Sequence, residues 1–398
     1  MSKYEYDVCV IGGLGHIGLP LAISLAETGQ KVVAYDINEK AIEKVNRGEM
    51  PFLERGAEEV LKKVLNKTFF TSSDKAVVKN SRFNVVVIGT PVDRHLNPSF
   101  TVFKQFFDEL VDYFHDDQHI ILRSTVYPGT TEKVKRYLEE RGLKTRLSFC
   151  PERIAQGYAM EELKSLPQIV SSFSREAVGE VASLFRLLTP DIVVLTPLEA
   201  ELAKLFSNVW RYIQFAISNQ FYQITSQHNL DFYRIYDAVV YKYPRTENLP
   251  RAGFAAGPCL FKDTMQLAAY SNNTFFLGHS AMFVNEGLPL AIIQRLKENY
   301  PLKEMNVGIL GMAFKANNDD SRDSLSYKLK KILEIEAKNI LCTDIYVRDA
   351  EFVGHKELIE KSEIIIVGAP HREYRELKIP VDKILVDVWN FYGKGGLF

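Results

Sequence analysis

Residues 6–29, YDVCVIGGLGHIGLPLAISLAETG, contain the clearest structural pattern of the chain. It opens with a short apolar, β-branched run typical of a buried strand and closes with apolar residues at helical spacing. The glycine-rich turn between them has the spacing G-x-G-x-x-G, which lets the backbone approach a pyrophosphate held at the helix N-terminus. We therefore predict a dinucleotide site, against the alternative of a glycine-rich turn that binds no dinucleotide. Its candidate residues are Gly13, Gly15, His16, Ile17 and Gly18.

The next apolar run, at residues 32–36, ends in the acidic residue that such a site needs. Asp36 stands where a carboxylate accepts hydrogen bonds from the adenosine ribose hydroxyls and repels a 2′-phosphate. The sequence therefore favours NAD over NADP. Two later strand ends, GTP and RSTVYPGTT, fall at the carboxyl ends of strands, where the ligands of open sheets bind. Their Thr90 and Thr125 are candidate wall residues of the same site.

Strand-like and helix-like segments alternate through the first half of the chain, which indicates a mainly parallel, doubly wound sheet. After residue 198 the pattern changes, and residues 199–228 contain neither proline nor glycine. Large apolar side chains surround much of this segment, so we expect a long buried helix. From residue 305 the alternation resumes as a second, smaller α/β domain. The predicted fold class is α/β, with two Rossmann-like doubly wound domains joined by a central helical domain with a long helix.

Length, charge and cysteine spacing exclude several classes of protein. The chain has 398 residues, too many for one core, and a formal net charge of -1, so no basic excess indicates a nucleic-acid partner. The N-terminus lacks the features of a signal peptide and no apolar run reaches membrane-spanning length, so we expect a cytoplasmic protein with no membrane partner. No cysteine belongs to a C-x-x-C pair, which argues against disulfides and against a metal site. The four cysteines are Cys9, Cys150, Cys259 and Cys342.

The stretch GFAAGPCLFKDT, residues 253–264, sets one cysteine behind small residues and a proline. The small side chains let a ligand approach the Cys259 sulfur closely. A helix is expected from Lys262 onward, and both a helix N-terminus and a nearby ammonium favour the thiolate. These features indicate an activated nucleophile. The alternative, a small buried apolar residue, stays open on this stretch alone.

Two further patterns are candidates for chemistry. Lys204 and Asn208 are four residues apart in the long helix, so they share a face and can stabilise an oxyanion together. On spacing alone, a solvated helix lysine is the other reading of Lys204. Glu152 in CPERIAQG follows a strand and is either a general base or a member of a surface ion pair. The aromatic residues of the long helix, among them Trp210 and Phe221, pack either within the chain or against a second subunit.

In chain order, these motifs resemble the landmarks of the UDP-glucose/GDP-mannose dehydrogenase family. The resemblance runs from about residue 8 to about residue 390 and also includes GEMPFLERG, NEGLP and GMAFKANNDDSRDS. It implies NAD-dependent, four-electron oxidation of the C6 alcohol of a nucleotide sugar to the uronate. It also implies three domains. These are an NAD-binding Rossmann domain at 1–196, a central helical and dimerisation domain with the cysteine loop at 197–300, and a nucleotide-sugar-binding domain at 301–398.

The resemblance also implies roles for single residues. Cys259 is the nucleophile that forms a thiohemiacetal and then a thioester, and Lys204 with Asn208 stabilises oxygen charge and contacts the substrate. Asp263 and Glu152 position or deprotonate water, and Thr125 helps to hold it. The remaining candidates contact ligands: Arg322 reaches NAD, and the substrate meets Arg245, Arg251, Phe254, Gly257 and Lys315.

Departures from the family's motifs favour one class of substrate over the others. Gln156 stands where members that act on UDP-glucose carry a second acidic residue, and Ala256 stands where glycine is usual. The PERI and GPCL forms are more similar to members that act on UDP-N-acetylhexosamines, such as UDP-ManNAc or UDP-GlcNAc. UDP-glucose and GDP-mannose stay open as substrates. A two-electron hydroxyacid dehydrogenase and a non-catalytic NAD-binding protein are the competing functions.

We also expect a particular assembly and a particular biological context. We expect a homodimer or a larger homo-oligomer built on the long helix, because its aromatic-rich circumference exceeds what one buried face needs. A uronate product indicates a role in polysaccharide biosynthesis in the cytoplasm.

Overall fold

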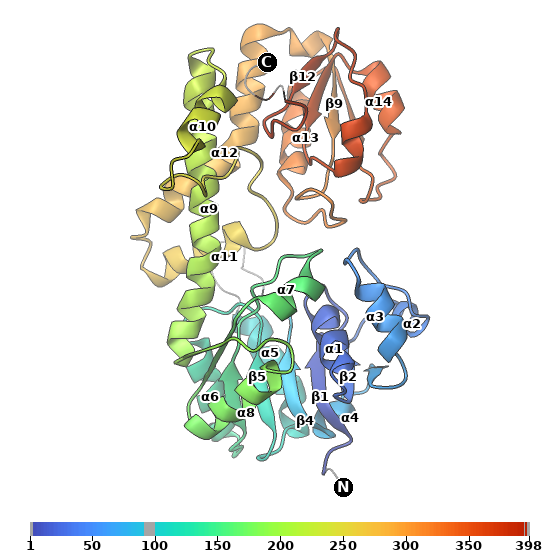
Figure 1. Cartoon of the computed structure of the whole chain (residues 1–398), viewed down its shortest axis with the longest axis vertical. Helices are drawn as coiled ribbons and strands as arrows, with labels where there is room; N and C mark the ends of the chain where they lie inside the picture. Colours follow the sequence, from blue (N-terminus) through green and yellow to red (C-terminus); the bar gives the residue numbers. More distant parts are fainter. Residues whose placement is uncertain (1–2, 91–99, 394, 396–398) are drawn as a thin grey trace. The chain divides into compact units, whose positions relative to one another are not determined.

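The computed structural model describes residues 3–90, 100–393 and 395. The chain divides into two compact units, Met1–Phe206 and Ser207–Phe398, called the first and the second unit below. Each unit holds one sheet of its own, and both sheets are visible in Figure 1.

The first unit is built on an eight-stranded sheet in the order β3-β2-β1-β4-β5-β6-β7-β8. All neighbouring strands are parallel except β6 and β7, which are antiparallel. The prediction of a mainly parallel sheet is confirmed, whereas β3 and the antiparallel step were not predicted. The strands are β1 (Tyr6–Ile11), β2 (Val32–Tyr35), β3 (Phe69–Ser72), β4 (Ser81–Val86), β5 (His119–Leu122), β6 (Arg146–Phe149), β7 (Gln168–Ser172) and β8 (Ile192–Leu195).

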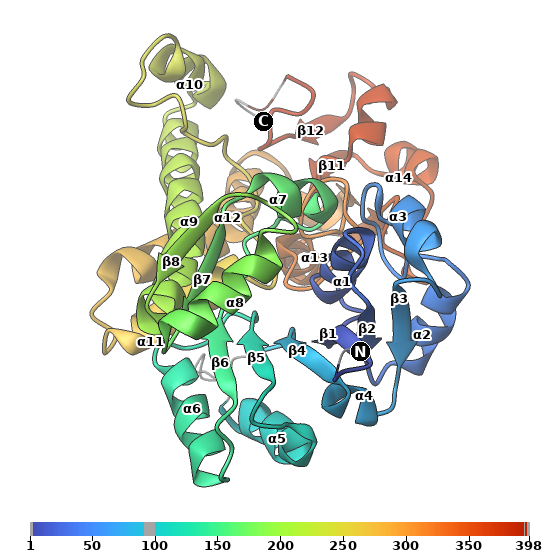
Figure 2. The same cartoon turned by 60° about the horizontal axis from the view of Figure 1, so that its bottom comes forward.

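Helices cover both faces of this sheet because its central strands are apolar on both sides. Along β1, Val8 and Val10 pack into one core cluster while Cys9 and Ile11 pack into the other. Helix α8 lies in front of β6, β7 and β8 in Figure 2. One face carries α1 (Gly18–Glu27), α2 (Glu39–Asn46), α3 (Ala57–Val64), α7 (Ala159–Ser165) and α8 (Arg175–Phe185); the other carries α4 (Ala76–Lys79), α5 (Phe100–Leu110), the 3₁₀ helix η1 (Val111–Tyr113) and α6 (Thr130–Glu140).

The second unit contains a four-stranded parallel sheet in the order β10-β9-β11-β12. Apolar residues of α12 and α13 pack on one face, and Leu358 of α14 packs on the other. The predicted second doubly wound sheet is therefore confirmed. Its elements are β9 (Asn306–Leu310), α13 (Leu325–Glu336), β10 (Asn339–Thr343), α14 (His355–Lys361), β11 (Ile364–Val367), β12 (Ile384–Val386) and the 3₁₀ helices η2 (Leu302–Glu304) and η3 (Arg372–Glu376).

Four α-helices lie between the last strand of the first sheet and the first strand of the second along the chain. They are α9 (Pro197–Gln227), α10 (Phe232–Val240), α11 (Leu260–Tyr270) and α12 (Phe276–Asn299). The predicted long helix is α9, but the expectation that it is buried is wrong for part of its circumference. Tyr212 is fully buried, whereas Trp210 and Phe221 are 60% and 47% exposed. The reason is that the chain covers only part of the helix, so one apolar stripe remains at the surface. This stripe, called the α9 stripe below, consists of Trp210, Ile217, Phe221 and Ile224.

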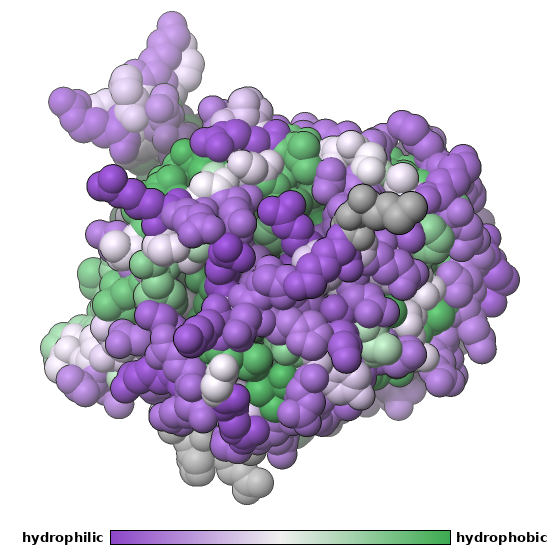
Figure 3. Space-filling model, turned by 90° about the horizontal axis from the view of Figure 1, so that it is seen from below, coloured by the Kyte–Doolittle hydropathy of each residue, from purple (hydrophilic) through white to green (hydrophobic). Residues whose placement is uncertain are grey.

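Among the described residues, α12 is the one helix with the length and hydropathy of a membrane span. The helix meets these two criteria by length and composition alone, as buried core helices also do. Inside the second unit, however, α12 makes polar contacts typical of a core helix: Asn285 is fully buried and hydrogen-bonded, and Lys328 donates to Glu286. On the face of the molecule drawn in Figure 3, hydrophilic residues predominate and hydrophobic residues form separate areas.

Candidate functional site

The predicted dinucleotide turn lies between β1 and α1, at the point where the strand order of the first sheet reverses. The turn is tightly packed at two of its glycines. A Cβ on Gly13 would lie 2.7 Å from the Cβ of Ala34, and one on Gly18 would lie 2.4 Å from the Gly12 oxygen. At Gly15, by contrast, a Cβ would meet only the Gly12 oxygen, at 3.8 Å. The turn is thus closed toward the protein and open at Gly15, which fits the approach of a pyrophosphate.

Asp36 follows β2 and is bound to this turn. Its carboxylate accepts hydrogen bonds from the backbone N–H groups of Leu14 and Asn38, both at 3.0 Å. The side chain is therefore held at the edge of the turn, where a ribose binds in dinucleotide folds. His16 in the same turn has its ring centroid 4.1 Å from that of Phe52. These residues fit the adenosine half of NAD.

Thr90 and Thr125 lie together at the carboxyl ends of β4 and β5. The Thr90 hydroxyl donates to the Thr125 carbonyl oxygen at 2.6 Å, and the Ser124 hydroxyl donates to the Ile88 carbonyl oxygen at 2.7 Å. These bonds tie the two strand ends to each other. The two predicted wall residues thus stand at the same edge of the sheet as the glycine turn.

Glu152 belongs to a buried ion pair, not to the surface pair that the sequence left open. Its Oε2 accepts from Nε of Arg123 at 2.9 Å, and its Oε1 accepts from the N–H groups of Arg153 at 2.7 Å and Ile154 at 3.1 Å. Arg123 is 1% exposed and also donates to Gln168 at 2.9 Å. Donors on both oxygens hold the carboxylate in one orientation. Arg123 was not predicted as a site residue, although a charged residue directly after an apolar strand was a usable signal.

Glu54, in the GEMPFLERG segment, was also missed. It is buried, and its two oxygens accept from the N–H groups of Gly157 and Ala159, each at 2.8 Å. Arg55 lies over the ring of Tyr158, 4.4 Å from its centroid. This segment therefore holds the loop that follows Glu152 and the start of α7.

Lys204 and Asn208 are one turn apart in α9, as predicted. Lys204 lies in the first unit and Asn208 in the second. The amide of Asn208 is buried and donates to Oδ2 of Asp263 at 2.5 Å. Asp263 is fully buried in the first turn of α11, and the ammonium of Lys262 lies 3.6 Å from its Oδ1. The structure thus brings together two of the predicted catalytic residues, Asn208 and Asp263.

Cys259 is the exposed cysteine of the chain, and the other three are buried. It is the residue directly before α11, which begins at Leu260, two residues earlier than Lys262. The thiol therefore stands at a helix N-terminus, where unpaired N–H groups stabilise a negative charge. This position favours the nucleophile over the small buried residue.

The cysteine loop packs on the segment that follows β9. The N–H of Gly257 donates to the Asp323 carbonyl oxygen at 3.2 Å, and a Cβ at Gly257 would lie 2.5 Å from the ring of Phe314. Lys315 comes next in the chain, with its ammonium 5.6 Å from the Phe314 ring centroid. The ring of Phe254 lies edge-on to Trp389, with centroids 6.3 Å apart. The thiol and the predicted substrate segment are thus neighbours in the second unit.

The three predicted arginines have different surroundings. Arg322 donates to Asp320 at 2.6 Å, and this hydrogen bond, with a smaller contribution from the nearby Cys259, raises the pKa of the guanidinium. Arg245 and Arg251 are exposed, and their guanidinium groups lie over Tyr243 and Tyr233, 5.5 Å and 5.7 Å from the ring centroids. Arg322 therefore belongs to the block beside the thiol, whereas Arg245 and Arg251 occupy the surface upstream of the loop.

Three segments of the chain match the models of one family in order. Residues 6–189 match its NAD binding domain, residues 198–286 its central domain and residues 308–394 its UDP binding domain. The chain belongs to the UDP-glucose/GDP-mannose dehydrogenase family. It is an NAD-dependent nucleotide-sugar dehydrogenase, as the motifs predicted, and its cofactor is NAD.

Named relatives of this dehydrogenase align over nearly the whole chain. The UDP-N-acetyl-D-mannosamine dehydrogenase of Pyrococcus horikoshii is 29% identical over 92% of this chain and 90% of its own. That of Methanocaldococcus jannaschii is 26% identical, over 94% and 89%. The solved structure of the Pyrococcus horikoshii enzyme superposes with a TM-score of 0.86 at 27% identity, covering 94% of this chain and 91% of that one. A UDP-glucose dehydrogenase from Pyrobaculum islandicum, 24% identical with a TM-score of 0.88 over 97% and 94%, supports the fold.

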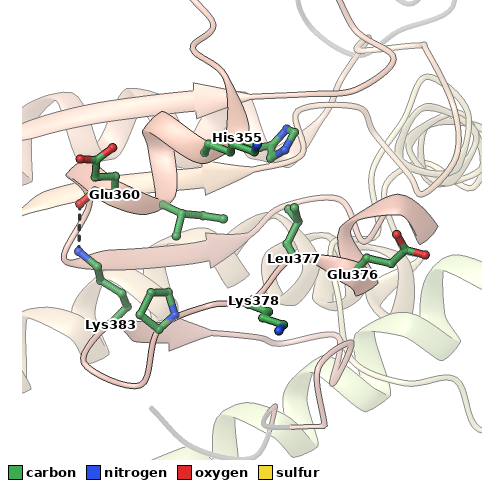
Figure 4. A pocket seen from close by; sticks show the side chains of 9 residues that line it. His355, Glu360, Glu376, Leu377, Lys378 and Lys383 are labelled. Atoms are coloured by element: carbon green, nitrogen blue, oxygen red, sulfur yellow. Dashed lines mark hydrogen bonds between the residues drawn. The ribbon is translucent and has the colours of Figure 1, made fainter.

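The second unit of the dehydrogenase also has a surface pocket of about 500 Å³ that contains none of the predicted site residues. Figure 4 shows it between α14 and the segment that leads into β12, with Leu377 pointing into it. The lysine and glutamate side chains around it are of mixed charge, and the Lys383 ammonium donates to the Glu360 carbonyl oxygen at 3.1 Å. None of the residues that line this pocket is a cysteine, and none belongs to the cysteine loop.

Proposed function

We propose that this dehydrogenase oxidises the C6 alcohol of a UDP-N-acetylhexosamine to the carboxylate, with Cys259 as the covalent nucleophile. The observation that carries the proposal is the exposed thiol at the N-terminus of α11, packed beside the segment of Lys315 and Arg322. Relatives named UDP-N-acetyl-D-mannosamine dehydrogenase support UDP-ManNAc as the substrate, with UDP-GlcNAc as its near alternative. UDP-glucose and GDP-mannose are the competing substrates.

The reaction needs a thiol because it removes four electrons from one carbon. Loss of a proton and a hydride converts the alcohol to an aldehyde, and bound NAD supplies the hydride acceptor in both oxidations. The Cys259 sulfur then bonds to C6 and its proton goes to oxygen, which gives a thiohemiacetal. Loss of a second proton and hydride gives a thioester. Water attacks the thioester carbonyl, the carbon–sulfur bond breaks, and the carboxylate and the thiol are released.

The negative charge that develops on the oxygen bonded to C6 must be stabilised by hydrogen-bond donors. Asn208 uses its amide to bind Asp263, and an amide has a second N–H to offer. Asp263 would thus orient Asn208, while Lys204 supplies a cation one turn away on α9. By analogy with other oxyanion holes, each donor is worth about 3 kcal/mol in the transition state. For the hydrolytic step we propose that Glu152, Asp263 and Thr125 position or deprotonate the water.

The ligand-binding residues divide between the two units. In the first, the cofactor residues are those of the glycine turn with Asp36, Thr90 and Thr125, and this arrangement supports binding of NAD through its pyrophosphate and ribose. In the second, we propose that the substrate is held by the block beside the thiol. The proposed substrate residues of the second unit are Asn208, Arg245, Arg251, Phe254, Gly257 and Lys315, with Arg322 reaching NAD. Lys204, which belongs to the first unit, is a further proposed substrate residue.

We further propose a three-domain division at 1–196, 197–300 and 301–398, and a homodimer in the cytoplasm that supplies uronate for polysaccharide biosynthesis. The support for the dimer is the α9 stripe, four large apolar side chains spaced along one face of a helix. Large exposed apolar stripes of this kind are typical of interfaces between subunits. A second copy would cover the stripe.

A panel assay tests the proposed function. Purified protein and NAD are incubated with UDP-ManNAc, UDP-GlcNAc, UDP-glucose and GDP-mannose, and NADH is followed by its absorbance. We expect the highest kcat/KM with a UDP-N-acetylhexosamine and two NADH for each sugar oxidised. One NADH for each sugar would favour a two-electron dehydrogenase, and oxidation of UDP-glucose alone would refute the substrate assignment.

A further inference from the structure

The loop that presents Cys259 is held at its start by a single side chain. Asn219 of α9 binds both backbone groups of Gly253: its Oδ1 accepts from the Gly253 N–H at 2.9 Å, and its Nδ2 donates to the Gly253 carbonyl oxygen at 3.0 Å. Asn219 is fully buried. One amide thus takes the place of a neighbouring strand and fixes the peptide groups on both sides of Gly253.

A second buried asparagine sets the orientation of the first. The other proton of Asn219 Nδ2 is donated to Oδ1 of Asn285 in α12 at 2.9 Å, and Nδ2 of Asn285 donates to the Tyr212 carbonyl oxygen at 3.0 Å. Turning the Asn219 amide over would place its N–H₂ group against the Gly253 N–H. The pair, called the asparagine clamp below, therefore has one satisfied arrangement.

The other side of the loop is closed by an aromatic ring. A Cβ on Gly253 would lie 2.3 Å from ring atoms of Trp389, so the loop backbone is confined between α9 and this ring. Farther along, Gly257 is bound to Asp323 and lies against Phe314. Cys259 follows two residues later at the start of α11. The loop is therefore fixed at two points ahead of the thiol, Gly253 and Gly257. At the first point, the asparagine clamp supplies the hydrogen bonds and Trp389 supplies the apolar contact.

We infer that Asn219 is a positioning residue for the Cys259 nucleophile, supported by Asn285. The inference rests on the proposed function, because it assumes that the thiol must meet C6 in one geometry. Misplacement of a nucleophile by about 1 Å can cost about a hundredfold in rate. Asn219 acts through its hydrogen bonds to the backbone of Gly253, and Asn285 acts by orienting Asn219.

The test compares Asn219→Asp with Thr225→Val. The carboxylate keeps the shape of the amide, but it sets an oxygen against the Gly253 carbonyl and against Asn285 Oδ1. Thr225 is a matched control, because it is buried in the same helix and its hydroxyl donates only within the helix, to the Tyr222 carbonyl oxygen at 2.9 Å. Two quantities are measured, kcat with saturating NAD and sugar, and the pH profile of alkylation by iodoacetamide. Native alkylation reports on Cys259 because the other three cysteines are buried.

We expect Asn219→Asp to lower kcat by about tenfold to a hundredfold and to change the alkylation rate by about tenfold, with the KM for NAD unchanged. The control should stay within about twofold of wild type in both measurements. If Asn219→Asp does not fold, Asn285→Leu is used instead. It removes the hydrogen bond that orients Asn219 but leaves both bonds from Asn219 to Gly253, so kcat and the alkylation rate should change in the same direction as expected for Asn219→Asp, but by a smaller factor. A folded variant with the control's alkylation profile would overturn the inference, whatever its kcat. Failure of the proposed function is distinguishable, since it would appear as uronate production by Cys259→Ala.

Discussion

The four cysteines occupy two kinds of surroundings. Burial raises the pKa of Cys150 to about 12 and that of Cys342 to about 11, and it raises the pKa of the Cys9 thiol still further. These thiols stay protonated at neutral pH and are inert as nucleophiles. Cys259 is exposed and stands at a helix N-terminus, where the thiolate is stabilised. One residue of four therefore has the surroundings that covalent catalysis needs.

The first prediction follows for Cys259. Cys259→Ala should abolish steady-state formation of the uronate, because the aldehyde cannot reach the acid without a thioester. Binding of NAD, measured by calorimetry, should stay within about twofold of wild type, since the thiol and the glycine turn belong to different units. Near-normal uronate formation by the variant, with two NADH for each sugar, would show that Cys259 is not the nucleophile.

His119 provides a pH-dependent prediction. Its Nε2 lies 2.7 Å from the Ser148 hydroxyl and its Nδ1 lies 3.2 Å from a Glu180 oxygen, and burial lowers its pKa to about 4. Between pH 6.5 and about 4 the unfolded chain binds this proton more readily than the folded protein, so stability is present above that window and is lost as the pH falls through it. The loss in the free energy of unfolding is at most about 3 kcal/mol.

Urea denaturation at pH 7 and pH 4.5 measures this effect. His119→Gln should show a smaller loss of stability between the two pH values than wild type, because the titrating group is gone. His228→Gln, at an exposed histidine, should keep the wild-type difference. Equal differences in wild type and His119→Gln would contradict the prediction.

Among the helices and loops, buried carboxylates of this protein accept hydrogen bonds from the backbone N–H groups at the start of helices. Glu201 of α9 accepts from the N–H groups of Gly129 and Thr131 at the start of α6, at 2.6 Å and 2.8 Å, and its burial raises its pKa. Glu54 does the same for α7 and the loop that carries Glu152. A negative charge at a helix N-terminus satisfies N–H groups that the helix cannot. These contacts join segments about 70 and 100 residues apart in the chain.

Glu54→Ala tests the second of these contacts. The variant leaves two buried N–H groups without an acceptor, so we expect the free energy of unfolding to fall by about 2 kcal/mol. Glu58→Ala is the matched control, since Glu58 is exposed, lies in the first turn of α3 and forms a surface ion pair with Lys62. It should change stability by less than about 0.5 kcal/mol. A Glu54→Ala variant as stable as Glu58→Ala would show that the contact adds nothing.

At the scale of the whole molecule, the α9 stripe is the feature that a single chain leaves unexplained. Its side chains lie on one face of the helix, whereas Tyr212 and Ala216 of the same helix are buried inside the second unit. A helix that is apolar beyond one buried face needs a second partner. In the proposed homodimer, that partner is the same surface of another copy.

Light scattering of Phe221→Glu tests the assembly. We expect wild type to have the mass of a dimer or a larger oligomer at micromolar concentration, and the variant to shift toward the monomer because each interface would bury two new charges. Gln220→Glu places the same charge on the neighbouring exposed residue and should leave the mass unchanged. A monomeric wild type would refute the proposed dimer.

The local features of this dehydrogenase could be predicted from the sequence. The strand, glycine turn and helix around Gly15, the acidic residue Asp36 and the helix that starts behind Cys259 all depend on residues within one or two dozen positions, so periodicity and glycine spacing are sufficient to predict them. The order of such motifs along the chain was then enough for the family and for NAD.

Contacts between segments that are distant in the chain could not be predicted in this way. Strand β3 and the antiparallel step at β7, the burial of Arg123 with Glu152, the contact of Glu54 with α7 and the clamp of Asn219 on Gly253 all depend on which surfaces pack together. The same is true of α9, whose apolar residues predicted burial although the fold covers only part of the helix. A local sequence pattern indicates which side chains avoid water or need a hydrogen bond. The residues that cover or bind them depend on how the whole chain packs.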